Sequence, residues 1–387
     1  MTSAGAPLAP ADPKDKRQAE TGQDTMEHFT GTKAVADSHA FSIAALEAHL
    51  QRELPGFAGP LAVEQFKGGQ SNPTYRLVTP GRSYVMRSKP GPAAKLLPSA
   101  HAVEREFRVM RALSGTGVPV PQMLLLCEDE AVIGRAFYVM EFIAGRVLWD
   151  QSLPGLSREE RGAIYDEMNR VIAALHSVDV EAVGLAGYGK PGNYFERQIG
   201  RWSRQYLASA TETIEPMDRL LEWLPANLPA QARDESRVSV VHGDYRLDNL
   251  VFHPTEPRVL AVLDWELSTL GHPLADFSYH CMAWHIPPGT FRGIGGLDHA
   301  ALGIPPEADY IERYCRRTGR TGPGDVAALK ADWNFFLAYN LFRLAAITQG
   351  IARRVVDGTA SSAQARATGA STRPLAEMAW GFAQRVG

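Results

Sequence analysis

The segment from residue 238 to 277 constrains the fold and chemistry of this 387-residue chain more than any other part. An apolar, β-prone run leads into His242-Gly243-Asp244, Asn249 follows five residues after Asp244, and Asp264 closes a second apolar run. Residues 249–253 and 259–263 can pair as a hairpin across a turn that contains two prolines. This pairing predicts that Asp264 returns close to Asn249.

The three polar residues of this segment have the chemistry that phosphoryl transfer requires. Such an enzyme needs a carboxylate beside the accepting hydroxyl and oxygen ligands that hold Mg²⁺ on the phosphates of ATP. Asp244, Asn249 and Asp264 could supply these groups. Each also has a structural alternative, because His242 could hold the loop by hydrogen bonding and any single Asp could cap a turn. The combination, placed between two apolar strands, favours the catalytic interpretation.

The composition of the chain fits a globular enzyme and limits its partners. Hydrophobic residues make up 45% of the sequence, and the formal net charge is -3. No run of Lys and Arg marks a nucleic-acid-binding face. Charged residues, Gly or Pro interrupt every apolar stretch, so we expect no membrane partner. No apolar signal core begins the chain, and three widely spaced cysteines suit reduced thiols, which together predict a cytoplasmic location.

The first part of the chain predicts a disordered tail over residues 1–40 and a small strand-rich domain over 41–143. Gly68, Gly69, Gln70, Ser71 and Asn72 form a polar loop between two predicted strands, 62–66 and 74–78. Such a loop can cover a phosphate with backbone N–H groups, or it can be an ordinary hairpin turn.

Charged residues beside this loop offer a second contact with the nucleotide. The strand alternation of residues 84–87 places Arg87, and with it Lys89, on one face, where a cation could reach phosphates or remain a solvated edge charge. An amphipathic helix over 102–113 begins with Glu104 and Glu106, and either could pair with Arg87. Acids in a first helical turn also occur for dipole reasons alone.

Residues 144–387 predict a mainly helical domain. The preceding strand breaks after Glu141 and Ile143, where a linker between two lobes can offer backbone groups to adenine. Helices are expected at 157–176, 201–224 and 324–356, the last as one helix or two, and at 375–382, with a flexible run over 358–372. His176 is interpreted as a structural helix-terminal histidine. The G-x-G-x-x-G pattern at 187–192 is set aside because it follows a helix, not a strand.

The motif of His242, Gly243, Asp244, Asn249 and Asp264 resembles that of the aminoglycoside phosphotransferase family, over about residues 62–380. The resemblance implies a protein-kinase-like, bilobal α+β fold with a small antiparallel N-lobe that carries one helix and a mainly helical C-lobe. It also implies roles for individual residues. These are Asp244 as catalytic base, Arg246 as charge stabiliser, Asn249 and Asp264 as Mg²⁺ ligands, residues 68–72 as the phosphate loop, Glu106 as the helix acid, and Asp276 as a brace of the catalytic loop.

One departure from the family pattern points to a subgroup. Arg87 stands where most such kinases carry Lys, and Arg binds phosphate oxygens with a different geometry. The segment 87–106 resembles the kinase-like domain that is fused to some acyl-CoA dehydrogenases, where Arg also occurs. That resemblance implies phosphorylation of a hydroxyacyl-CoA, of the 4-hydroxy fatty acyl type, and a separate acyl-CoA dehydrogenase as a possible partner.

The charge of the last helices bears on the small-molecule acceptor. From residue 331 onward the sequence has six Arg and three acids, which disfavours a polycationic acceptor such as an aminoglycoside. Aromatic residues in and near this region could favour a part-apolar acceptor or could simply be helix core; they are Trp284, Trp333, Phe335, Phe336 and Phe342. Two alternatives remain: a nucleotide-binding regulator of an acyl-CoA dehydrogenase without transfer activity, and an antibiotic phosphotransferase.

Overall fold

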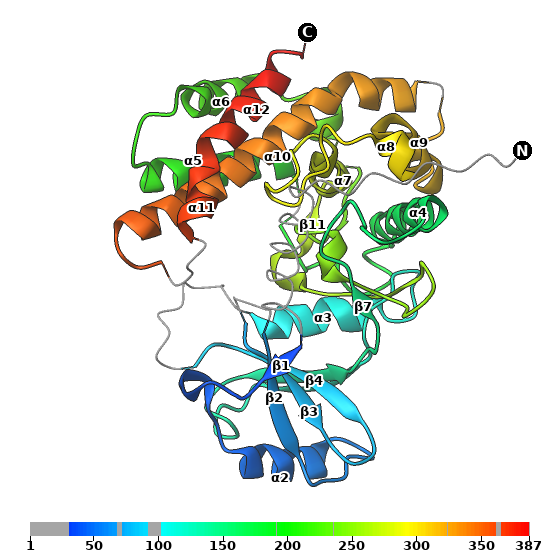
Figure 1. Ribbon diagram of the computed structural model, residues 1–387, viewed down its shortest axis with the longest axis vertical. Coiled ribbons are helices and arrows are strands. Elements are labelled where there is room, and N and C mark those ends of the chain that lie inside the picture. The colour runs from blue at the N-terminus through cyan, green and yellow to red at the C-terminus, as the bar shows by residue number, and fades with distance from the viewer. Residues whose placement is uncertain are drawn as a thin grey trace, which may run out of the picture. The chain divides into compact units, whose positions relative to one another are not determined.

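The computed structural model describes residues 31–67, 72–91, 102–190, 192–234, 236–322, 324–360 and 365–386. The chain divides into two compact units (Figure 1). The first comprises Met1–Phe107 and Gln122–Phe142, and the second comprises Arg108–Pro121 and Ile143–Gly387. Residues 108–121 therefore belong with the second unit, although the sequence places them in the first domain.

The first unit is built on a six-stranded sheet in which every pair of neighbours is antiparallel. Its spatial order is β1-β2-β3-β4-β6-β5. The strands are β1 (Thr32–Lys33), β2 (Ala62–Phe66), β3 (Thr74–Val78), β4 (Ser83–Ser88), β5 (Met123–Cys127) and β6 (Phe137–Glu141). The helix α3 (Val103–Leu113) begins in this unit, and helix α2 (Ile43–Glu53) and a short 3-10 turn η1 (Asp37–His39) precede β2.

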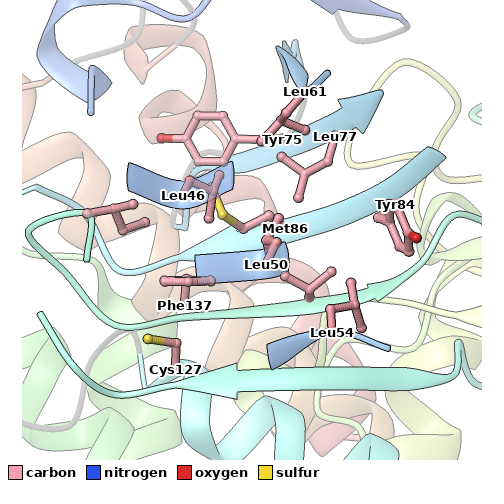
Figure 2. Close-up of a cluster of buried hydrophobic side chains, with 12 residues drawn as sticks. Leu46, Leu50, Leu54, Leu61, Tyr75, Leu77, Tyr84, Met86, Cys127 and Phe137 are labelled. Carbon is pink, nitrogen blue, oxygen red and sulfur yellow. The ribbon is translucent and has the colours of Figure 1, made fainter. Parts of the chain in front are cut away.

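Helix α2 covers one face of this sheet with a stripe of leucines. Ser42 caps the helix by accepting a hydrogen bond from the N–H of Ala45 at 3.2 Å. Leu46 and Leu50 are completely buried, and Figure 2 shows them over the sheet with Leu77 and Met86. Burial of each such side chain contributes about 1.5–3 kcal/mol to folding. The alternation of the strands supplies the other half of this core.

The predicted disordered tail is wrong for its last ten residues. Within residues 31–40, β1 pairs with β2, Thr32 Oγ1 donates to Glu64 at 2.8 Å, and η1 follows. A two-residue strand of polar residues has no apolar alternation that a sequence pattern could reveal. Residues 1–30 of that prediction lie outside the described residues.

The second unit is mainly helical. Its longer helices are α4 (Arg158–His176), α5 (Tyr194–Ser209), α6 (Glu215–Ala226), α7 (Pro273–Cys281), α9 (Glu307–Arg317), α10 (Asp325–Val356) and α12 (Thr372–Ala383), and α8 (His299–Leu302) and α11 (Ala365–Ala370) are short. Its strands are β7 (Arg146–Val147), β8 (Ser239–Val241), β9 (Leu250–Phe252), β10 (Val259–Val262) and β11 (Thr269–Gly271). The 3-10 turns are η2 (Ala230–Arg233), η3 (Leu247–Asn249), η4 (Trp265–Leu267) and η5 (Met282–Trp284).

The single helix predicted over 201–224 is two helices. α5 ends at Ser209, whose hydroxyl turns back to the carbonyl of Gln205 at 2.8 Å, and α6 begins at Glu215. Pro216 stands in the first turn of α6, where its missing N–H costs nothing. Pro225, which the sequence places beyond the helix, lies inside its last turn.

The run predicted to be flexible over 358–372 contains helix α11 and the first residue of α12. Its small residues serve helix packing, because a Cβ on Gly369 would lie 2.9 Å from the Cα of Ala352 in α10. An Ala- and Gly-rich contact surface has the same composition as a linker, which explains the wrong interpretation. Residues 361–364 lie outside the described residues.

Helix α10 is one helix of 32 residues and forms the centre of the second unit. It packs against α5, α7, α11 and α12, as Figure 1 shows for α12. By length and composition alone it could cross a membrane, but 78% of its most apolar window is buried inside the protein. Such burial is also expected of the core helix of a globular unit.

Candidate active site

The loop after β8 is held by a buried carboxylate. β8 pairs with β11, and all three of its residues are buried. Asp276 in α7 accepts hydrogen bonds from the backbone N–H groups of His242 and Gly243, at 2.7 and 2.9 Å. The prediction that Asp276 braces this loop is confirmed.

Histidines on either side of this brace have structural roles. His176, at the end of α4, contacts Asp276 at 3.3 Å and the hydroxyl of Tyr314 at 2.7 Å. Burial lowers the pKa of His176. The pKa of Asp276 is held below its usual value despite burial, because His176 and the loop N–H groups bond to it. The structural interpretation of His176 is thus confirmed, and His242 bonds the carbonyl of Leu263 at 2.9 Å.

Asp244 carries three contacts that fix its carboxylate. Asn249 Nδ2 donates to its backbone carbonyl at 2.8 Å and to its Oδ2 at 3.2 Å. Arg246 donates to the same Oδ2 at 2.9 Å, and the hydroxyl of Tyr279 donates to Oδ1 at 2.5 Å. The carboxylate is therefore oriented by groups from both its own loop and helix α7.

The predicted hairpin is present and joins Asp264 to Asn249. Val262 pairs with Leu250, and the N–H of Leu263 donates to the carbonyl of Asn249 at 2.8 Å. Asp264 follows directly, in the left-handed region at φ 66 and ψ 59. A non-glycine residue in this conformation is uncommon, and such strain concentrates at functional sites.

The oxygen atoms in this region fit a magnesium site. Because the amide nitrogen of Asn249 bonds Asp244, its Oδ1 is left to accept or to coordinate. Carboxylate and amide oxygens are ligands that Mg²⁺ prefers, and it is commonly held by one or two protein ligands together with phosphates. The described residues contain no cluster of three or more His, Cys, Asp or Glu that could hold a metal ion by themselves. A two-ligand site completed by a nucleotide is consistent with that finding.

Two arginines contact the loop that carries Asp244. Arg246, predicted as a charge stabiliser, pairs with Asp244 and lies 3.6 Å from Asp248. These carboxylates raise the pKa of Arg246 against the opposing effect of burial. Arg343 of α10 donates to the carbonyl of Gly243 at 2.6 Å and stacks over the rings of Trp202 and Tyr279. It is thus a further support of the loop.

The first unit contains two ion pairs between the charged residues predicted to contact the nucleotide and the acids of α3. Arg87 Nε lies 3.1 Å from Glu106 Oε2, and both side chains are almost fully buried. Glu106 also accepts hydrogen bonds from Asn72 at 2.8 Å and from the hydroxyl of Tyr138 at 3.1 Å. The half-exposed Lys89 pairs with Glu104 at 3.1 Å.

The remaining predicted nucleotide contacts stay predictions. Gly68, Gly69, Gln70 and Ser71 lie outside the described residues. Asn72 is completely buried and its amide serves Glu106, so in this structure its side chain supports the Arg87 pair. Glu141 ends β6 and its N–H donates to the carbonyl of Gln122 at 2.9 Å, and Ile143 begins the second unit.

The model of the phosphotransferase enzyme family matches residues 62–329 of this chain. The chain belongs to this family. The members of this family are phosphotransferase enzymes. The kinase-like α+β fold predicted from the motif is confirmed, since solved phosphotransferases share it.

Relatives of this phosphotransferase fall into two groups. Acyl-CoA dehydrogenase family member 10 of Mus musculus is 47% identical over 359 residues, which are 92% of this chain and 32% of that protein. The chain spans less than half the length of this relative and of the similar protein from Rattus norvegicus. A solved Ralstonia eutropha protein, provisionally named an aminoglycoside phosphotransferase, is 65% identical, with a TM-score of 0.81 over 89% of this chain and 99% of that chain.

A more distant structure shows the fold alone. A thermostable mutant of an aminoglycoside phosphotransferase, solved with AMP-PNP and hygromycin B, is 16% identical and has a TM-score of 0.55. The match covers 87% of this chain and 98% of that chain.

Sequence reasoning did not find Tyr279 and Arg343 beside the Asp244 loop of the second unit. It also missed Tyr138 beside the Arg87 pair of the first unit. Tyr279 follows Asp276 by three positions, so both lie on one face of α7, and this helical spacing could have identified it. Tyr138 stands opposite Arg87 in the strand register, which only the pairing of β4 with β6 reveals. Arg343 was counted only as part of a basic region.

The aromatic side chains that the sequence offered for acceptor binding belong to the buried core. Trp284, Trp333, Phe335, Phe336 and Phe342 are between 0% and 6% exposed. They support the folding of the second unit and say nothing about the acceptor. The three cysteines, Cys127, Cys281 and Cys315, are buried free thiols.

Proposed function

We propose that this phosphotransferase uses ATP and Mg²⁺ to phosphorylate the hydroxyl of a hydroxyacyl-CoA, of the 4-hydroxy fatty acyl type. The observation that carries the proposal is the carboxylate of Asp244, which is fixed by Asn249, Arg246 and Tyr279 on a loop braced by Asp276. A carboxylate held in this way is suited to orient the acceptor hydroxyl and receive its proton.

The residues around Asp244 would bind the metal ion and stabilise charge on the phosphates. Asn249 and Asp264 would hold Mg²⁺, which supplies neutralising charge to the phosphates when bound. Arg246 is a further cation beside the carboxylate, where it can stabilise charge on a transferring phosphoryl group. In the first unit, Asn72 and Tyr138 hold Glu106, and Glu106 in turn orients Arg87, which suits a residue that binds phosphate.

The proposal of an acyl-CoA acceptor rests on the related proteins and on the charge of the last helices. The relatives that match more than nine-tenths of this chain are named as acyl-CoA dehydrogenase family members. The excess of Arg over acids after residue 331 opposes a polycation. Arg373 pairs with Glu212 and Arg353 with Asp357, so part of that excess is neutralised locally.

The test is an ADP-release assay across acceptor classes. Purified protein with Mg·ATP is offered 4-hydroxyacyl-CoA, the free hydroxy acid, a sugar, choline and an aminoglycoside. We expect turnover with the CoA ester and its loss, by about 10³-fold or more, in Asp244→Asn. Activity with none of these acceptors would refute the proposal. Stabilisation by Mg·ATP without transfer would support the nucleotide-binding regulator instead.

An antibiotic phosphotransferase is the second candidate, favoured by the name of the 65% identical Ralstonia eutropha protein. It requires acidic side chains around the acceptor to bind a polycation. Faster turnover of an aminoglycoside than of the CoA ester in the same assay would establish it.

A further inference from the structure

A cavity of about 250 Å³ lies in the second unit, away from the residues that surround Asp244. Its lining comes from residues before and within the first turns of α5, from residues 228, 232–234 and 237–238, and from β11 with the residue that follows it. Asp244, Asn249 and Asp264 do not line it. The function proposed above assigns it no role.

The polar lining of the cavity is predominantly cationic. Four cations, Lys190, Arg197, Arg233 and Arg237, face two acids, Glu196 and Asp234. Asp234 is already engaged, because Arg237 lies 3.2 Å from it and both the N–H and the hydroxyl of Ser236 donate to it. No acid partner for Lys190 or Arg233 occurs among the residues that the structure describes. An excess of positive charge therefore remains for a ligand.

The cavity also has a buried, neutral hydrogen-bond donor. His272 is 4% exposed and lines the cavity. Its Nδ1 accepts a hydrogen bond from the N–H of Leu274, so the proton resides on Nε2. That Nε2–H lies near the carbonyl of Gln231 without a hydrogen bond of ordinary geometry. Burial lowers the pKa of His272 to about 3, so the ring is neutral at physiological pH. A neutral ring can donate a hydrogen bond to a ligand without being repelled by the neighbouring cations.

The start of helix α5 faces the same space. Asn193, Tyr194 and Glu196 of its first turn line the cavity, and the side chain of Asn193 does not cap the helix. The positive end of a 16-residue helix thus points at the cavity, and helix N-termini commonly bind phosphate.

Apolar residues also line the cavity. They include Leu228, Ala232, Val238 and Leu270, and the ring of Tyr194 packs against Gly271. A ligand that matches both kinds of lining combines several phosphates with a flat, partly apolar group. A phosphorylated nucleoside has this combination, whereas inorganic phosphate does not.

The cavity also has a defined relation to the catalytic loop. Val238 precedes β8, which leads to Asp244 six residues later, a span of at most about 20 Å. Tyr194, in the cavity wall, interacts electrostatically with Arg343, which donates to the carbonyl of Gly243. A pantetheine arm is long enough to cover such a distance.

We propose that this cavity binds the phosphorylated adenosine end of coenzyme A and so anchors the acyl-CoA acceptor. The proposal rests on the proposed function for its biological meaning. The cations and the start of α5 would hold the phosphates, and the apolar lining residues would hold the adenine. The acyl chain would then extend toward Asp244.

Binding is tested first, without reference to turnover. Isothermal titration calorimetry of the full chain is performed with coenzyme A, pantetheine, ADP and inorganic phosphate, each with Mg·AMP-PNP present to occupy the nucleotide site. We expect binding of coenzyme A and none of pantetheine. Equal affinity for coenzyme A and ADP, or for coenzyme A and phosphate, would overturn the assignment.

Charge reversal then locates the site. Lys190→Glu and Arg233→Glu are compared with Arg204→Glu, an exposed arginine of α5 outside the cavity. We expect each cavity variant to weaken coenzyme A binding about tenfold or more and the control to leave it unchanged. Loss in all three variants, or in none, would contradict the proposal.

Kinetics connect the cavity to the acceptor. Hydroxyacyl-CoA is compared with the pantetheine thioester of the same hydroxy acid. Arg233→Glu should raise KM about tenfold for the CoA ester and leave kcat and the KM of the pantetheine ester unchanged. A shift of both KM values would show a general defect and refute the anchor. If no thioester is phosphorylated, the proposed function fails, while the calorimetry still decides the binding site.

Discussion

At the scale of single residues, Tyr279 is the group that touches the proposed catalytic carboxylate from outside its own loop. Its hydroxyl donates to Asp244 Oδ1 at 2.5 Å, while Arg246 and Asn249 occupy Oδ2. Tyr279→Phe should lower kcat about tenfold and leave the KM for ATP unchanged, because the carboxylate loses one of its fixed contacts. Tyr165→Phe, which removes a buried hydroxyl bonded to Gln151 in the same unit, is the control and should keep kcat. Equal kcat values for the two variants would contradict this role.

The two ion pairs of the first unit differ in burial and should differ in energy. Arg87 and Glu106 are 10% and 2% exposed, whereas Lys89 and Glu104 are 29% and 37% exposed. Arg87→Met leaves Glu106 buried without its cation and should cost about 3–5 kcal/mol of unfolding free energy. Lys89→Met should cost about 0–1 kcal/mol. Urea denaturation measures both values, and similar losses would disprove the assignment.

The sequence predicted which side chains meet only where these residues lie close together along the chain. Asp244 and Asn249 lie on one loop, and a short hairpin returns Asp264, so their grouping follows from spacing. The residue pattern alone left Glu104 and Glu106 as alternatives because both acids lie in the first turn of α3, and only the family resemblance pointed to Glu106. Only the packing of α3 determines which acid turns inward. Tyr138 reaches Glu106 through strand register, and a buried tyrosine has no sequence mark that separates it from core.

At the scale of elements, close helix contact explains the segment that the sequence suggested was flexible. Gly369 in α11 meets the backbone of Ala352 in α10, and a Cβ would lie 2.9 Å from its Cα. Gly369→Ala should therefore separate the helices and cost about 1–3 kcal/mol. Gly381→Ala in α12 meets nothing within 4 Å and should be neutral or stabilise by about 0.5–1 kcal/mol. Urea midpoints compare the two, and equal effects would contradict the contact.

Elements with a strong period were predicted well. The stripe of α4 and the alternation of β3 gave their positions because one face of each element is buried. β6 was predicted as a short apolar run, and its first four residues are all buried. β1 and the division between α5 and α6 escaped prediction for different reasons. β1 is held by pairing with β2 and not by its own apolar residues. Residues 210–214 interrupt two helices whose apolar stripes continue across the break.

At the scale of the whole molecule, buried neutral histidines make stability depend on pH. Burial lowers the pKa of His272 to about 3 and of His280 to about 4. In the unfolded chain a histidine titrates near about 6.5. Between these values the unfolded state binds more protons than the folded state, so stability is full above about pH 6.5 and falls as the pH decreases.

The size of this effect can be measured with one variant. Each histidine contributes a slope that rises toward about 1.4 kcal/mol per pH unit below pH 6.5, so lowering the pH from 6.5 to 5 should cost about 3 kcal/mol for the two together. His280→Gln should remove about half of that loss, because glutamine does not titrate. Urea denaturation at pH 7, 6 and 5 provides the slopes, and parallel curves for wild type and His280→Gln would show that His280 does not titrate on unfolding.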